Sequence, residues 1–320
     1  MAQPWLSIIS PTYNGQEFLP SALNSIIVQQ DQNVECIVVD DGSTDSTLSI
    51  LETYQKRLPL KILQPPPRRN WVTNTNYALS FASGKYVCFL HQDDLWFQNR
   101  LLTMKQLTEQ FPEVVLFLHS SNFIDRAGEN LGLWSCPLPA FPRVIQSKLI
   151  LERLLVQNFI SIVAPIFRRE TALEVGGMDD SLWYTADWDF WLKIAACGSA
   201  LYYPKPLAGY RVHQHSQTFL RSSYLQDFHK QLDIVADRHL ALWAAPAHLK
   251  RRVCRLSHVS TEINVALAGS VHDAKPNIAK PIISLLLLGP LGWYRYFRDS
   301  RIWERASARI KARLISSRKS

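Results

Sequence analysis

The chain of 320 residues lacks the cysteine and glycine patterns that mark several common functional classes. Its five cysteines are isolated, with no CxxC pair and no zinc spacing, so we expect reduced, mostly buried thiols. Neither GxGxxG nor GxxxxGK[ST] occurs, which argues against dinucleotide-binding dehydrogenases and P-loop enzymes. A nucleotidyltransferase is disfavoured because no glycine-rich, basic phosphate loop lies near the N-terminus.

Long apolar runs are also missing. The apolar run at residues 281–294 has 14 residues, whereas a membrane-spanning helix needs about 20. The N-terminus shows no basic segment and no cleavage site, so we expect no signal peptide and a cytoplasmic protein. A hydrophobic fraction of 47% indicates a folded globular chain.

The net charge of +8 lies almost entirely at the C-terminal end. Residues 295–320 hold nine basic and two acidic side chains, and the preceding residues carry a net charge of only +1. A nearly neutral body argues against nucleic-acid binding. The basic tail instead predicts contact with an anionic surface.

The hydrophobic pattern predicts an α/β fold whose sheet is mostly parallel and flanked by helices. Short apolar segments alternate with segments of helical periodicity, which is typical of βαβ units. We expect an α/β domain over residues 1–218 and a helical C-terminal extension over residues 219–320. The predicted strands are residues 6–10, 34–39, 60–63, 85–90, 114–123, 160–167 and 201–207.

Two of the predicted strands end in paired carboxylates. Asp40 and Asp41 follow the second strand, and Asp93 and Asp94 follow the fourth. Parallel sheets bind ligands at the carboxyl ends of their strands, so these acids are expected at one edge. Adjacent acids repel unless a cation lies near, which favours a divalent metal with a phosphate-bearing substrate. The alternative is that the acids cap helices, the interpretation we prefer for Asp45.

Five segments, taken in chain order, together resemble a known enzyme family. They are SIISPTYN (residues 7–14), VVDDGSTD (38–45), YVCFLHQDD (86–94), ADWD (186–189) and YRVH (210–213). In this order and spacing they are similar to glycosyltransferase family 2, whose members have the GT-A fold. The resemblance covers about the first two-thirds of the chain, and five ordered motifs are more specific than any one alone.

The resemblance implies a metal-dependent glycosyltransferase that moves a sugar from a nucleotide-diphosphate donor with inversion. Asp187 would be the general base, and a divalent Mn²⁺ or Mg²⁺ would be held by Asp94 and His213. Donor contacts would come from Pro11, Thr12, Tyr13, Asp41, Asn76 and Asp93. The acceptor side would include Asp179 and Trp188, although a tryptophan at helical spacing is more often a core residue. We expect a uridine nucleotide and a role in cell-surface polysaccharide synthesis.

The chain departs from the family pattern at three places. His91 stands where the family often has an acid, and we interpret it as filling the strand end. Ala186 replaces a glutamate beside the predicted base. This change is the best support for an alternative function, a catalytically silent nucleotide- or glycan-binding module. Residues 68–70 replace a glycine-containing turn, and their arginines either contact the diphosphate or lie in a solvated loop.

The extension has two competing interpretations. Aromatic residues at 293–303 alternate with arginines, a pattern typical of a membrane interface. We therefore expect peripheral attachment to the inner face of the cytoplasmic membrane, beside a glycan or lipid-linked acceptor. The alternative is a helical hairpin that packs on the catalytic domain or on a second subunit of a homo-oligomer.

Overall fold

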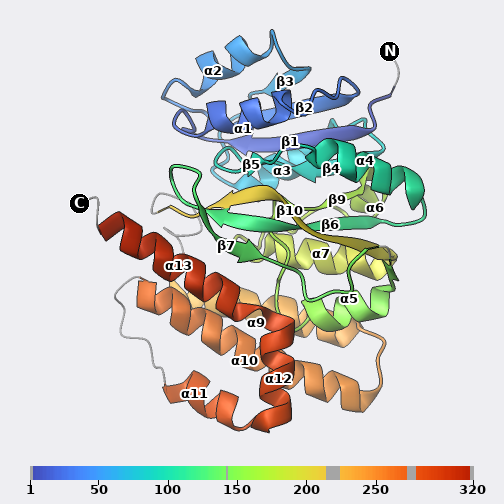
Figure 1. The fold of residues 1–320 in the computed structure, drawn as a ribbon, viewed down its shortest axis with the longest axis vertical. Coiled ribbons are helices and arrows are strands. Elements are labelled where there is room, and N and C mark those ends of the chain that lie inside the picture. Colours follow the sequence, from blue (N-terminus) through green and yellow to red (C-terminus); the bar gives the residue numbers. More distant parts are fainter. Residues whose placement is uncertain (1–2, 142, 214–223, 272–278, 318–320) are drawn as a thin grey trace.

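The computed structural model describes residues 3–141, 143–213, 224–271 and 279–317. A central sheet of ten strands lies between helices, and further helices extend from one side of it (Figure 1). The strands are β1 (Leu6–Thr12), β2 (Val34–Asp40), β3 (Leu60–Leu63), β4 (Tyr86–Phe89), β5 (Leu95–Trp96), β6 (Leu116–Ile124), β7 (Asn130–Trp134), β8 (Val144–Ile145), β9 (Ile166–Arg168) and β10 (Ala200–Arg211).

The strand order is β3-β2-β1-β4-β9-β6-β10-β5, with β7 beside β6 and β8 beside β10. The first four strands in this order are parallel, as predicted. Strand β9 then runs antiparallel between β4 and β6, and β10 is parallel to β6. The second half of the sheet therefore mixes directions, but β1, β2, β4 and β10 still bring motif residues to one region.

Helices cover both faces of the sheet. One face packs against α1 (Leu19–Ile27), α2 (Thr47–Tyr54) and α4 (Arg100–Gln110) in a single apolar cluster. The other face packs against α3 (Trp71–Ser80), α5 (Ser147–Leu154) and α7 (Ala186–Cys197). The remaining helices are α6 (Arg169–Glu174), α9 (Leu225–Leu242), α10 (Ala247–Val271), α11 (Ala279–Leu286), α12 (Gly289–Ser300) and α13 (Ile302–Ser317).

Strand β1 continues through Pro11 to Thr12, beyond its predicted end. Backbone groups of alternate residues point to opposite neighbours, and the Thr12 carbonyl accepts the Asp41 N–H at 2.9 Å on the β2 side. Pro11 therefore faces β4, which has already ended at Phe89. Because no ladder partner exists there, the missing N–H of proline costs nothing. The extension carries Thr12 to the edge where Asp41 lies.

The predicted strand at residues 160–167 is wrong over most of its length. Only Ile166–Arg168 forms a strand, and the Ala164 N–H closes a turn on the Ser161 carbonyl at 3.0 Å. Arg100 is fully buried and donates to the carbonyls of Val163 and Ala164, both at 3.3 Å. An apolar segment whose carbonyls bond a buried arginine satisfies its backbone without a ladder, which periodicity does not reveal.

The C-terminal helices pack on the α/β part through specific contacts. Gln231 of α9 accepts the N–H groups of Trp183 and Tyr184, both at 2.9 Å, just before α7. Glu304 of α13 accepts the N–H and hydroxyl of Ser135 at 2.7 and 2.6 Å, after β7. The extension therefore packs on the domain, as the alternative interpretation expected. Among the described residues, no helix is both long and apolar enough to cross a bilayer.

The predicted interfacial aromatic residues are divided between surface and interior, with Tyr294 and Trp303 63% and 67% exposed. Tyr296 is fully buried, and Phe297 stacks on Trp303 with ring centroids 5.5 Å apart. The indole N–H of Trp293 donates to the Leu285 carbonyl at 2.5 Å. The aromatic residues are therefore used partly for packing between helices and partly at the surface. Helices α11 and α12 and the turn between them also carry strongly exposed aliphatic side chains.

Candidate active site

The VVDDGSTD segment turns sharply after β2 and places one of its acids at the edge of the sheet. Asp40 turns back to accept the N–H and hydroxyl of Ser43 at 3.0 and 2.5 Å. Gly42 has φ +72°, and a Cβ there would lie 2.7 Å from Pro67, so only glycine fits. Asp41 is buried and accepts the Arg68 N–H at 2.7 Å. The turn therefore places Asp41 between β2 and the start of α3.

Tyr13 lies next to this turn and is joined to the fourth strand's motif. Gln92 accepts the Tyr13 N–H at 2.9 Å and donates to the Tyr13 carbonyl at 3.1 Å. The Arg69 guanidinium lies 4.1 Å from the centre of the Tyr13 ring, a cation–π contact. The buried Thr12 hydroxyl has no hydrogen-bond partner. Pro11, Thr12 and Tyr13 thus lie between the two pairs of acids.

Arg211, at the end of β10, fixes the turn that carries the second pair of acids. Its backbone N–H donates to Asp94 Oδ1 at 2.8 Å, and its Nε donates to the Asp93 carbonyl at 2.7 Å. Its Nη1 donates to the carbonyls of Asp125 and Arg126, both at 2.8 Å. The side chain is only 3% exposed. One arginine therefore joins three separate chain segments.

The pKa values of Asp93 and Asp94 shift in opposite directions because the two acids have different partners. Burial opposes ionisation of Asp93, but the His213 imidazole at 3.0 Å outweighs it and lowers the pKa of Asp93. Burial and the neighbouring Asp93 charge raise the pKa of Asp94 well above its usual range. Asp94 Oδ2 is buried and has no hydrogen-bond partner. Because an unpaired buried carboxylate oxygen is costly, this atom is suited to a bound cation.

The donor atoms beside Asp94 suit a divalent metal that also receives ligands from a substrate. The described residues contain no group of three or more His, Cys, Asp or Glu side chains that holds a metal by itself. Asp94 Oδ2 and His213 Nδ1 are both buried without partners, and carboxylate oxygen and imidazole nitrogen both bind manganese. The residues fit a cation completed by diphosphate oxygens, which is how Mg²⁺ commonly binds.

His91 stands near this turn as a neutral ring. Burial lowers its pKa despite the nearby Asp93 charge. Its ring lies 5.4 Å from that of Trp71, and the Trp71 indole donates to the Trp183 carbonyl at 3.2 Å. His91 therefore contacts an aromatic side chain, in agreement with its interpretation as a filler. The same contacts dock the loop before α7 beside the end of β4.

Asp187 begins α7 in a setting suited to proton transfer. Asn158 donates to Asp187 Oδ2 at 2.9 Å, and the Trp188 N–H donates to Oδ1 at 2.8 Å. The side chain is partly exposed, yet burial outweighs these bonds and raises its pKa to about 6. A carboxyl with this pKa is ionised at neutral pH and remains basic enough to accept a proton.

The second acid of the ADWD segment has a different role. Asp189 is fully buried and accepts from Arg238 at 2.9 Å and from His239 at 2.8 Å. Although burial opposes ionisation, the His239 hydrogen bond and the Lys193 charge lower its pKa to about 2. Arg238 also pairs with Asp179 at 2.8 Å. Asp189 and Asp179 thus join α7 and its preceding loop to α9.

Three predicted positions are used for packing. Trp188 is 3% exposed and its indole donates to the Leu154 carbonyl at 2.8 Å, which places it in the core and out of reach of an acceptor. Asn76 bonds both backbone groups of Met178, at 2.8 and 2.9 Å. Ala186 is fully buried, so this position offers no room for a solvated acid. Trp188 is therefore a core residue and not an acceptor contact.

The structure adds residues that the motifs did not single out. Asn158 orients the predicted base, Gln92 joins Tyr13 to the Asp93–Asp94 turn, and Arg211 fixes the paired acids. Arg211 and Gln92 lie within the YRVH and YVCFLHQDD segments, so the motifs carried a signal for them. Asn158 lies in no motif and has no sequence signal.

A sequence model of the family described as "Glycosyl transferase family 2" matches residues 7–172. Two curated relatives are each named an uncharacterized glycosyltransferase. The one from Rickettsia typhi is 24% identical over 287 residues, 86% of this chain and 79% of its own length. The one from a Nostoc species is 28% identical over 212 residues, which is 65% of each chain.

Solved glycosyltransferase structures share the fold. Staphylococcus aureus TarS 1–349 in complex with UDP-GlcNAc gives a TM-score of 0.65 at 20% identity, covering 96% of this chain and 91% of that one. The mannosyltransferase PcManGT from Pyrobaculum calidifontis, in complex with GDP-Man and Mn²⁺, gives a TM-score of 0.57 at 19% identity. That alignment covers 98% of this chain and 87% of the mannosyltransferase. At such identities the likeness concerns the fold.

Proposed function

Because the chain belongs to glycosyltransferase family 2 and is a glycosyltransferase, we propose that it transfers a sugar from a UDP-sugar to a hydroxyl acceptor with inversion. The observation that carries this proposal is the joining of three motifs at one sheet edge. Arg211 of β10 bonds the Asp93–Asp94 turn, and Gln92 of that same turn bonds Tyr13 beside Asp41.

The donor would lie across the ends of β1, β2 and β4. Asp41 offers a carboxylate to N–H groups of the base, next to the Tyr13 ring and the Arg69 guanidinium. Arg69 also supplies positive charge toward the diphosphate. Support for a nucleotide sugar comes from two structural neighbours, which were solved with UDP-GlcNAc and with GDP-Man.

Asp94, with Asp93 and His213 beside it, would hold a divalent cation. The unpaired Oδ2 of Asp94 is the atom best placed for this role. Such a cation, Mn²⁺ or Mg²⁺, neutralises the negative charge of the departing nucleotide diphosphate. The Arg211 bonds keep the Asp93–Asp94 turn in one orientation before any ligand arrives.

Asp187 would be the general base. Its carboxylate takes the proton of the acceptor hydroxyl while that oxygen bonds to the anomeric carbon of the sugar. The bond from that carbon to the diphosphate oxygen breaks on the opposite side, and the configuration inverts. Asn158 holds one carboxylate oxygen and the Trp188 N–H holds the other, so the base is oriented before the acceptor binds.

The acceptor would be a glycan or a lipid-linked saccharide, and the product a cell-surface polysaccharide or glycolipid. Asp179 lies in the loop before α7 and is paired with Arg238. Its proposed role is to contact the acceptor while it keeps this ion pair. Attachment to the inner face of an anionic membrane would bring a lipid-linked acceptor to Asp187.

The pKa of Asp187 predicts an acid limb in the activity. The pKa of this carboxyl is raised to about 6, so the base is increasingly protonated as the pH falls through that value. We expect kcat at saturating donor to fall about tenfold for each pH unit below the limb. Calorimetric donor binding at the same pH values is the control. A flat kcat between pH 5 and pH 8 would contradict the role of Asp187.

A thermal-shift screen of nucleotide diphosphates and nucleotide sugars with manganese tests the proposed donor class. We expect UDP and UDP-sugars to raise Tm most, because bound ligand stabilises the folded state by mass action. Repeating the screen with a chelator should remove most of the increase. A larger increase with another nucleotide would reassign the donor, and no increase with any of them would count against donor binding.

A further inference from the structure

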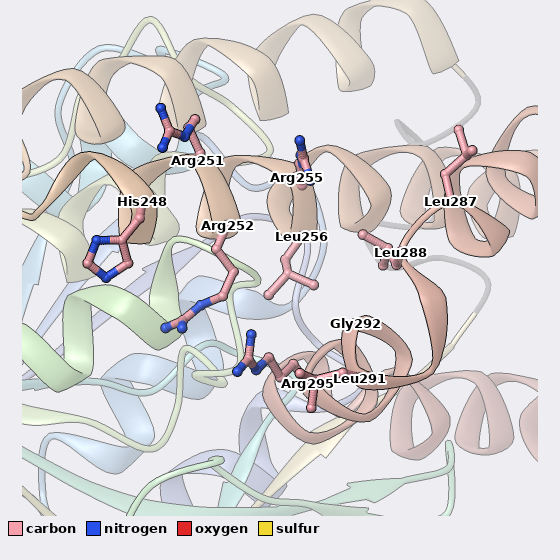
Figure 2. A pocket seen from close by; sticks show the side chains of 10 residues that line it. All are labelled: His248, Arg251, Arg252, Arg255, Leu256, Leu287, Leu288, Leu291, Gly292 and Arg295. Atoms are coloured by element: carbon pink, nitrogen blue, oxygen red, sulfur yellow. The ribbon is translucent and has the colours of Figure 1, made fainter.

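Helix α10, helix α12 and the turn before α12 form a cavity with a cationic and aliphatic lining. The cavity has a volume of about 300 Å³, and Figure 2 shows the residues around it. Its lining is cationic and aliphatic, with no carboxylate: His248, Arg251, Arg252, Arg255, Leu256, Leu287, Leu288, Leu291, Gly292 and Arg295. His248 and Arg252 lie at one end in this view, and Leu287 and Leu288 lie at the other.

The arginines of this cavity carry mostly uncompensated charge. Arg252 pairs with Glu152 at 2.8 Å. Within the part of the chain that the structure describes, no carboxylate pairs with Arg251, Arg255 or Arg295. Several unpaired guanidinium groups around one cavity attract an anion, and phosphate oxygens match their donor geometry.

An exposed apolar surface continues from the cavity. Five aliphatic side chains of α11, α12 and the turn between them form it, each at least 53% exposed: Ile282, Ile283, Leu286, Leu287 and Leu291. We call these five residues the aliphatic patch. Leu287, the most exposed at 82%, and Leu291 belong to both the patch and the cavity lining. Exposed apolar side chains that gather on one part of a protein surface usually mark an interaction site.

The arrangement matches one partner better than others. A membrane surface offers phosphate headgroups directly beside acyl chains, and the protein offers arginines directly beside exposed leucines. Helices α11 and α12 lie at the end of the molecule farthest from β2 and β3 (Figure 1), so a membrane there leaves the donor site open. We propose that the cavity binds the phosphate of an anionic phospholipid while the aliphatic patch enters the outer part of the bilayer.

This inference deepens the proposed function by naming the membrane-contacting surface, but its test needs neither donor nor acceptor. The full-length protein is sedimented with vesicles of phosphatidylcholine alone and with vesicles of equal parts phosphatidylcholine and phosphatidylglycerol. We expect binding to the anionic vesicles only. The Arg251→Gln/Arg255→Gln/Arg295→Gln variant should bind these at least about tenfold more weakly. The Leu286→Ser/Leu287→Ser variant should also lose binding.

A matched variant controls for general charge. Lys56→Gln/Arg143→Gln/Lys205→Gln removes the same charge from exposed positions on the α/β part and should keep wild-type binding. Equal loss in both triple variants would overturn the site, as would wild-type binding by the arginine triple variant. Self-association that the leucine variant abolishes, without vesicle binding, would assign the patch to a second copy. Displacement of the protein from anionic vesicles by inorganic phosphate alone, with no lipid added as a competitor, would support a phosphate-binding site.

A separate observation concerns α13 and the base. Arg305 donates to the carbonyl of Asn158, whose side chain in turn donates to Asp187 at 2.9 Å. The Arg305 guanidinium lies 4.8 Å from the centre of the Trp134 ring, and the Trp134 indole donates to the Phe159 carbonyl at 2.7 Å. We infer that Arg305 is a positioning residue that fixes Asn158 and, through it, the catalytic carboxylate.

The cationic side chain acts on the base in two ways. It holds the segment that carries Asn158, and its charge favours the ionised form of Asp187. Burial lowers the pKa of Arg305 itself to about 10, so the guanidinium remains charged at neutral pH. This residue lies outside the matched family region, at the far end of the chain.

The pH profile of kcat distinguishes this role from a merely structural one. Arg305→Met should move the acid limb upward by about one pH unit, so that kcat near pH 6 falls about fivefold. Arg305→Lys keeps the charge and should restore most of the profile. Lys311→Met removes a different α13 contact, with the Leu131 carbonyl at 3.0 Å, and should leave the limb in place. An unchanged limb in a folded Arg305→Met protein would overturn the inference.

Discussion

Asp187→Asn is expected to lower kcat about a thousandfold while donor binding stays as in the wild type. The change removes the proton acceptor but keeps the shape of the side chain and an oxygen for the Asn158 amide. Asp187 lies at the first turn of α7, and the donor contacts lie at the ends of β1, β2 and β4. Rates are measured by release of UDP from a UDP-sugar with acceptor, and binding by calorimetry.

Asp237→Asn is the matched control for that variant. Asp237 is an exposed acid on α9, and its substitution should change neither rate nor binding. Turnover by Asp187→Asn at more than about a tenth of the wild-type rate would place the base elsewhere. Equal absence of turnover in the wild type and the variant, with intact donor binding, would favour the catalytically silent alternative that Ala186 suggested.

Asp94→Asn is expected to abolish the manganese-dependent part of nucleotide diphosphate binding. Asparagine preserves the acceptor for the Arg211 N–H, so the turn should keep its shape. It replaces the unpaired, buried carboxylate oxygen with a neutral amide group, which is a poor ligand for a hard cation. Titration of UDP into the variant with manganese should resemble titration into the wild type with chelator.

Asp45→Asn gives the comparison for the second variant. Asp45 bonds Thr47 and the Gln16 N–H at the start of α2, close in sequence to the donor site but without an orphaned oxygen. This change should leave manganese-dependent binding intact. Undiminished manganese-dependent binding by Asp94→Asn would remove the metal role of Asp94 and leave the orphaned oxygen without explanation.

The sequence predicted the elements of the site better than their contacts. The motif order correctly indicated the family and the fold because each motif is short, local and at a strand end. The pairing of His213 with Asp93 crosses 120 residues, and no local pattern specifies it. Arg211 is a similar case, since one motif letter gives no hint of its bonds to the Asp94 carboxylate and to three backbone carbonyls.

Tertiary context explains the positions that the pattern placed wrongly. Trp188 has the spacing of both a core residue and an exposed ring, and only the Leu154 carbonyl decides between them. Residues 160–167 are as apolar as a strand, but the carbonyls of Val163 and Ala164 accept hydrogen bonds from Arg100. In α12 the aromatic pattern does not distinguish Tyr296, which is fully buried, from Tyr294, which is 63% exposed. Composition records how apolar a segment is and not which partner covers it.

The central claim is that the edge formed by β1, β2, β4 and β10 is a metal-assisted nucleotide diphosphate site. The most direct measurement is crystallographic, with UDP and manganese and diffraction recorded at the manganese absorption edge. We expect an anomalous peak from a manganese ion bound to Asp94 Oδ2, and a uracil ring between Tyr13 and Asp41. A nucleotide bound at any other place, or at this edge with its diphosphate away from Asp94, would contradict it.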